Sequence, residues 1–102
     1  WVSITHGDEG VRVSVLCPQA VNTPMIAATE EGGVAGVDGV IEPEAVAGTV
    51  VEGLAAERFL ILPHPVVAEY MQRKVGDYDR WLGGMRKLQA RYGENAVAGL
   101  GD

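Results

Sequence analysis

Two apolar runs, separated by a longer segment with helical periodicity, organise this chain. The first run, Val11–Cys17, is rich in β-branched residues and loses its polar alternation toward its carboxyl end. That pattern is typical of a strand covered on both faces of a parallel sheet. The second run, Phe59–Leu62, is wholly apolar and is closed by Pro63. The two runs therefore predict two buried strands.

The segment between the two runs has apolar residues at steps of three and four. Pro43 suits the first turn of a helix and Glu44 its positive dipole end, so the pattern predicts a helix over Pro43–Arg58. A strand, a helix and a strand in this order form a right-handed parallel unit. Trp1–His6 fits the end of a preceding helix, and Tyr70–Tyr92 has an apolar stripe at helical spacing. The pattern predicts an α/β fold with two parallel strands, a crossover helix and C-terminal helices.

The loop after the first predicted strand is the first candidate for a ligand site. Ligands of open parallel α/β sheets bind beyond the carboxyl ends of the strands, and Pro18–Thr23 follows such an end. The loop offers backbone groups and a hydroxyl. The alternative is an ordinary proline turn in which Thr23 caps a helix that starts at Pro24.

The order of these residues resembles a known family. Gly10-Val-Arg-Val, a short apolar strand, Cys17-Pro and then Val21-x-Thr-Pro-Met is similar to the segment after the catalytic helix of short-chain dehydrogenases/reductases. The resemblance implies the C-terminal part of a Rossmann-like doubly wound parallel sheet. It also implies that Pro18, Val21 and Thr23 face the cofactor, NAD or NADP, with the Val21 backbone at the nicotinamide carboxamide. Because the order of the downstream elements matches too, we favour this interpretation over the ordinary turn.

The same resemblance divides the chain into four parts. Met25 and Ile26 would belong to the substrate lid, and Gln19 stands where many relatives have glycine. The expected parts are the end of the catalytic helix, a strand and the cofactor-facing turn (1–28), the substrate-lid loop (29–42), a helix and the last strand (43–62), and a C-terminal helical extension (63–102).

The family's catalytic machinery is not in its place in this sequence. The catalytic serine, the Tyr-x-x-x-Lys pair and the Gly-rich dinucleotide loop would all precede Trp1. We therefore expect a fragment of a longer protein, about the last two fifths of an enzyme of ~250 residues, with no catalytic residue and no activity alone. A second Tyr-x-x-x-Lys, formed by Tyr70 and Lys74, lies after both strands, and Tyr70 falls on the apolar stripe. We interpret this pair as structural.

Charge is uneven along the chain, whose net charge is −6. The basic residues are concentrated after Glu69, where they alternate with apolar residues at helical spacing. That arrangement is typical of a solvated helix face, so we expect no nucleic-acid partner. A basic-helix module for an acidic partner is the weakest of the functional hypotheses.

Composition excludes several kinds of site. The single cysteine, Cys17, excludes an internal disulfide framework and a cysteine-rich zinc site, and fits a reducing, cytoplasmic setting. His6 and His64 have no companion at metal-ligand spacing, so we expect surface roles for both and no metal. No apolar run approaches the ~20 residues that span a bilayer, and we expect no membrane partner.

Two functional hypotheses remain ahead of the others. In the first, the chain belongs to an NAD(P)-dependent oxidoreductase that interconverts a small-molecule alcohol and a carbonyl, and it supplies substrate-lid and oligomerisation elements. In the second, it is a non-catalytic, self-associating assembly module. Two strands without further sheet neighbours leave apolar surface uncovered, so both hypotheses predict a homo-oligomer or another partner instead of a bare monomer.

Overall fold

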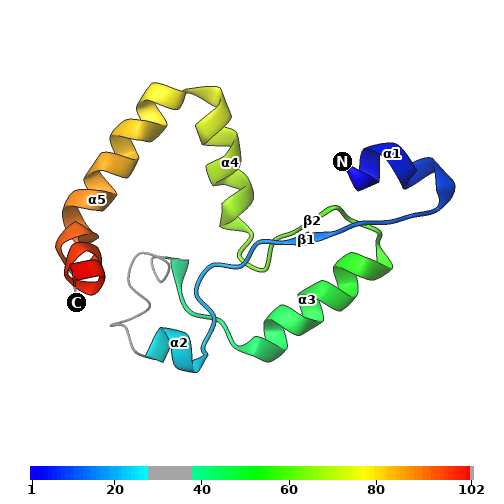
Figure 1. Cartoon of the computed structure of the whole chain (residues 1–102), viewed down its shortest axis with the longest axis horizontal. Helices are drawn as coiled ribbons and strands as arrows, with labels where there is room; N and C mark the ends of the chain where they lie inside the picture. The colour runs from blue at the N-terminus through cyan, green and yellow to red at the C-terminus, as the bar shows by residue number, and fades with distance from the viewer. Residues whose placement is uncertain (28–37, 102) are drawn as a thin grey trace.

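The computed structural model describes residues 1–27 and 38–101 (Figure 1). The expected substrate-lid loop therefore lies largely outside the described residues, which resume at Asp38. The elements are, in order, α1 (Val2–His6), the 3₁₀ turn η1 (Gly7–Glu9), β1 (Val15–Leu16), α2 (Pro24–Ala27), α3 (Pro43–Ala55), β2 (Leu60–Ile61), α4 (Val66–Gly76) and α5 (Tyr78–Gly101).

Strands β1 and β2 form a two-stranded parallel sheet, with Val15 opposite Leu60 and Leu16 opposite Ile61. Helix α3 connects them, so the predicted strand, helix and strand are all present. The backbone N–H of Cys17 extends the ladder by donating to the carbonyl of Ile61 at 3.1 Å. The predicted α/β class with two parallel strands is confirmed.

The first strand is shorter than the predicted Val11–Cys17. Pairing needs a partner, and β2 contributes only two residues, so the ladder begins at Val15. The residues before it are held by side chains instead. The Ser14 hydroxyl donates to the Arg58 carbonyl at 2.7 Å, and Arg12 forms an ion pair with Glu57 at 2.9 Å.

Helix α3 packs against β2 at one close point. Ile61 is 3% exposed, and it lies against the buried Gly53 of α3. A Cβ at Gly53 would come within 2.7 Å of two carbons of the Ile61 side chain. The helix ends at Ala55, before the predicted Arg58, and Glu57 then reverses the chain with a left-handed φ of 56°.

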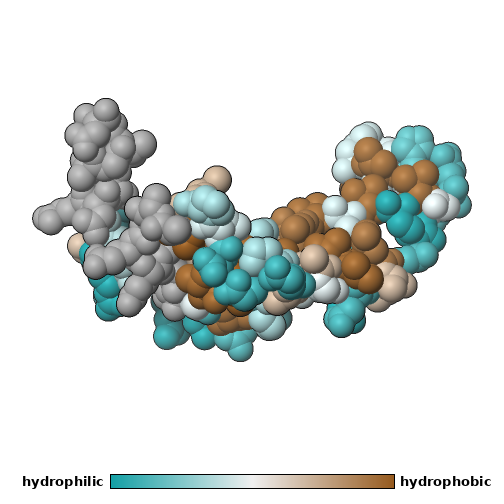
Figure 2. Space-filling view, turned by 90° about the horizontal axis from the view of Figure 1, so that it is seen from below, coloured by the Kyte–Doolittle hydropathy of each residue, from teal (hydrophilic) through white to brown (hydrophobic). Residues whose placement is uncertain are grey.

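Little apolar surface is buried within the described part of the chain. Ala20 and Ile61 are the buried hydrophobic residues there, whereas Leu16, Val51, Leu54 and Phe59 are exposed. Figure 2 shows hydrophobic residues gathered on the side of the molecule that carries α3. Helices α4 and α5 form an arch beside the sheet, with the C-terminus far from the N-terminus (Figure 1). No described helix is both long and apolar enough to cross a membrane.

Candidate functional site

The turn that follows β1 is fixed by pairing with the segment that leads into α3. Val21 and Ile41 form an isolated parallel bridge. The Ile41 N–H donates to the Ala20 carbonyl at 3.2 Å, and the Asn22 N–H donates to the Ile41 carbonyl at 2.8 Å. In a parallel bridge of this kind, the N–H and C=O of the central residue point to the other edge. The backbone groups of Val21 therefore face away from Ile41, and no described residue bonds to them.

Side chains fix the same turn at two further points. The Asn22 amide donates to the carboxylate of Glu42, at 3.0 and 3.3 Å from its two oxygens. The backbone N–H of Gln19 donates to Nδ1 of His64 at 3.1 Å. Ala20, between these anchors, is 1% exposed. The turn is thus held from Ile41, from Glu42 and from the segment after β2.

His64 is the residue that sequence analysis placed wrongly. It was expected on the surface, but it is 4% exposed. Its Nδ1 accepts the Gln19 N–H, and its Nε2 lies 3.2 Å from the Gly39 carbonyl oxygen. Pro63 and Pro65 flank it in the sequence and mark a turn, but they carry no signal for burial. Its two partners lie 45 and 25 residues away in the chain, beyond the reach of any local pattern.

The five residues expected to face cofactor and substrate lie in one continuous stretch. Pro18 is exposed, whereas Val21 and Thr23 are half-buried in the turn. The Thr23 carbonyl accepts the Ile26 N–H at 3.0 Å, which joins the turn to the short helix α2. On α2, Met25 is 82% exposed and Ile26 is half-buried. The large apolar side chain of Met25 therefore lies next to the turn and makes little contact with the described residues.

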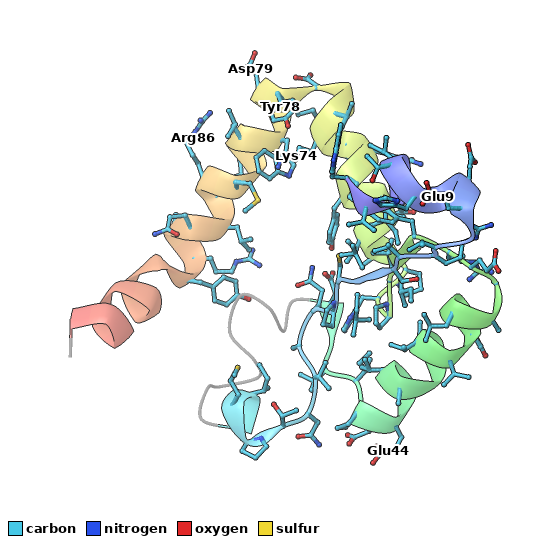
Figure 3. All side chains as sticks on the ribbon, turned by 45° about the vertical axis from the view of Figure 1, so that its right-hand side comes forward. Glu9, Glu44, Lys74, Tyr78, Asp79 and Arg86 are labelled. Carbon is cyan, nitrogen blue, oxygen red and sulfur yellow. The ribbon has the colours of Figure 1, made fainter. Side chains whose placement is uncertain are left out.

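The Tyr70–Lys74 pair does not have the arrangement of a proton-transfer pair. The Tyr70 hydroxyl donates to Oδ1 of Asp38, and this hydrogen bond, with burial adding to it, raises the pKa of Tyr70. An acid catalyst needs the opposite shift. Lys74 is turned toward α5, with its Nζ 4.5 Å from the ring centre of Trp81 and 5.8 Å from that of Tyr78. Figure 3 shows Lys74 between α4 and α5, close to Tyr78.

Other possible sites lie away from the turn. A hollow of about 350 Å³ is lined by residues of α3, β2 and α4, among them Thr49, Leu60 and Ala68. None of the five expected site residues lines it. No cluster of three or more metal-binding side chains is found in residues 1–27 and 38–101. Cys17 is half-buried, and its backbone extends the sheet.

The turn offers hydrogen-bonding groups but no group for proton transfer. Its side chains, Pro18 to Thr23, include neither an acid nor a base. It offers one N–H and one C=O at Val21, on a backbone that neighbouring hydrogen bonds hold in place. A planar amide, which has one donor and one acceptor side, matches such a pair.

Comparisons with known proteins identify dehydrogenases over half of the chain. A stretch of 52 residues, 51% of this chain, is 48% identical to the "1-deoxy-11-beta-hydroxypentalenate dehydrogenase" of Streptomyces exfoliatus. A stretch of 51 residues, 50% of the chain, is 47% identical to the protein of the same name from Streptomyces arenae. These matches span only 19% and 18% of the lengths of the two relatives. No family model matches the chain, and no solved structure matches it.

Proposed function

We propose that this chain is part of an NAD(P)-dependent short-chain dehydrogenase/reductase that interconverts an alcohol and a carbonyl. Within that enzyme it orients the nicotinamide and supplies substrate-lid and oligomerisation elements. The identity of half of the chain to two proteins named as dehydrogenases supports an oxidoreductase. The parallel unit and the position of the turn after β1 support a Rossmann-like sheet with a ligand at its carboxyl edge.

The observation that carries the proposal is the outward-facing backbone of Val21. Its N–H and C=O have no partner among the described residues, while the backbone on both sides is fixed by Ile41. A carboxamide would bond to both groups, and the Thr23 hydroxyl lies two residues further along the same turn. The residues therefore fit the nicotinamide end of the cofactor.

Each part of the turn has a defined task in this proposal. A nicotinamide dinucleotide, when bound, accepts or donates the hydride. Val21 orients the carboxamide, Thr23 donates a hydrogen bond to the cofactor, and Pro18 ends the strand so that the chain can bend around it. Met25 and Ile26 present apolar surface to the substrate and exclude water from it. The proton is handled by residues outside this chain.

A cofactor titration tests the proposal in the longest polypeptide that the gene encodes. Addition of NADH or NADPH is expected to shift the NMR signal of the Val21 amide. Thr23→Val, which replaces the hydroxyl with a methyl group of similar size, is expected to raise the cofactor dissociation constant by about fivefold, the effect of one hydrogen bond. Thr49→Val is the matched control, because the Thr49 hydroxyl bonds within α3 to the Ala45 carbonyl. Unchanged binding in Thr23→Val would contradict the proposed contact.

A second measurement concerns the chain of 102 residues alone. We expect it to show no cofactor-dependent turnover, because the proposed enzyme needs a Tyr-x-x-x-Lys pair before the first strand and a Gly-rich dinucleotide loop, and this sequence has neither. Turnover that is lost in Tyr70→Phe would contradict this expectation and restore Tyr70 as a catalytic candidate.

The alternative is a non-catalytic, self-associating assembly module. The exposed hydrophobic residues on α3 and on both strands favour it, since they need a partner in either case. The two proposals differ in one measurement. Self-association of the longest gene product without any binding of NADH or NADPH would favour the assembly module.

A further inference from the structure

His64 has two ring nitrogens with two different partners, and these partners settle its tautomer. The Gln19 N–H is a donor and requires an unprotonated Nδ1, from which it lies at 3.1 Å. The Gly39 carbonyl is an acceptor and requires a proton on Nε2, at 3.2 Å. The ring is therefore the neutral Nε2–H form. At 4% exposure, water has little access to replace either partner.

The ring joins three segments that are far apart in the sequence. His64 comes from the connection between β2 and α4, Gln19 from the turn after β1, and Gly39 from the segment that leads into α3. The neighbouring Asp38 is also bonded to the part of the chain after β2, because its carboxylate accepts a hydrogen bond from the Tyr70 hydroxyl on α4. The turn and the Asp38–Gly39 segment are thus both anchored to the chain that follows β2.

We propose that His64 is a positioning residue for the cofactor-facing turn. It holds the Gln19 amide through Nδ1, and it is itself oriented by the bond from Nε2–H to Gly39. Gln19 lies two residues before Val21, so this anchor fixes where the Val21 N–H and C=O are presented. The role in cofactor binding rests on the proposed function, whereas the hold on Gln19 does not.

Two conservative substitutions remove the two hydrogen bonds of His64, to Gln19 and to Gly39, one at a time. In His64→Asn, the side-chain amide reaches the position of Nδ1, so an acceptor for the Gln19 N–H remains and the bond to Gly39 is lost. In His64→Gln, the longer amide reaches the position of Nε2, so the bond to Gly39 remains and the acceptor for Gln19 is lost. His6→Asn is the matched control, since His6 is exposed and bonds to Glu9 in its own turn.

The experiment measures hydrogen exchange of the Gln19 amide and steady-state kinetics with NADH or NADPH in the longest gene product. His64→Gln is expected to speed Gln19 exchange about tenfold and to raise the KM for the cofactor about fivefold, with kcat within about twofold. His64→Asn and His6→Asn are expected to keep both values within about twofold of the unsubstituted protein.

Several results would overturn the assignment. Equal effects of His64→Asn and His64→Gln would mean that His64 has only a general structural role. Faster Gln19 exchange without a change in KM would remove the link to the cofactor. If neither variant folds, long-range nitrogen NMR of the unsubstituted protein tests the protonation of the His64 ring instead. Detection of an Nδ1–H or of a charged imidazolium at neutral pH would contradict the proposal. If the protein binds no cofactor, the proposed function is refuted. The hydrogen bond from Gln19 to His64 is then tested by Gln19 amide exchange alone.

Discussion

The absence of a side chain at Gly53 allows α3 to pack closely against the sheet. Gly53 lies against Ile61, and a Cβ there would come within 2.7 Å of the Ile61 side chain. We expect Gly53→Ala to lower the free energy of unfolding by about 1–3 kcal/mol, because the helix or Ile61 must move. Gly48→Ala, on the same helix with no atom within 4 Å, is expected to raise it by up to about 1 kcal/mol. Denaturant unfolding of both variants measures the difference, and equal effects would contradict this packing.

Tyr70 gives a prediction for alkaline pH. Its hydrogen bond to Asp38 raises its pKa above the ordinary value of 10.0, and burial adds to the shift. Because the protonated phenol is the form favoured by folding, this bond stabilises the folded chain fully below pH ~10 and is lost as the pH rises through the higher folded value. Phenolate absorbance is expected to show a tyrosine that ionises only above pH ~10.

Two variants assign that late step. Tyr70→Phe should remove it, and Asp38→Asn should move it to lower pH, because the carboxylate that accepts the phenol hydrogen and repels the phenolate is gone. Tyr78→Phe is the control, since among the described residues the Tyr78 ring contacts Lys74 and Trp81 and not a carboxylate. A late step that persists in Tyr70→Phe would show that another tyrosine is responsible.

At the residue scale, the sequence predicted local features of the candidate site but not its long-range contacts. The turn Pro18–Thr23 was predicted because strand ends and prolines are local signals. The burial of His64 and the bond from Tyr70 to Asp38 were not, since both depend on partners 25 to 45 residues away. Such contacts depend on the fold as a whole, which brings segments that are distant in the sequence together.

At the scale of elements, Asp77 both ends α4 and begins α5. Its N–H donates to the Arg73 carbonyl at 3.2 Å, and its side chain accepts the Arg80 N–H at 3.1 Å. The second bond is an N-cap, so we expect Asp77→Ala to lower the free energy of unfolding by about 1 kcal/mol. Asp79→Ala is the control, because Asp79 points away from the arch and forms no cap (Figure 3). Helix content followed by circular dichroism during unfolding measures both, and equal losses would contradict the cap.

The predicted elements agree with the structure in type and order, and differ in length. Helix periodicity located α3 because its first turn has Pro43 and its apolar residues repeat, both of which are local properties. The strand was overestimated because Val11–Cys17 is rich in β-branched residues throughout, while only Val15 and Leu16 find a paired neighbour in β2. The length of a paired strand depends on the length of its neighbour in the sheet, and the composition of one strand alone does not give that length.

At the scale of the whole molecule, the described chain leaves apolar faces open. Val51 and Leu54 of α3 are 68% and 56% exposed, and Leu16 and Phe59 of the sheet region are exposed as well. A parallel sheet is normally covered on both faces, and a single two-stranded unit covers neither fully. Burial of the surface that these side chains still expose would contribute about 0.5–2 kcal/mol each, and their sum is large against the usual stability of a domain.

We therefore expect the chain of 102 residues to associate with itself through the α3 face. Sedimentation equilibrium at micromolar concentration should give a mass of at least twice the 10.8 kDa of one chain. Leu54→Glu should weaken association at least tenfold, because a buried charge replaces an apolar contact. Ala45→Glu is the control, since nine residues of helix place Ala45 about 180° from Leu54. A compact, cooperatively folded monomer at that concentration would refute the expectation, and dissociation by both variants would place the interface elsewhere than the Leu54 side of α3.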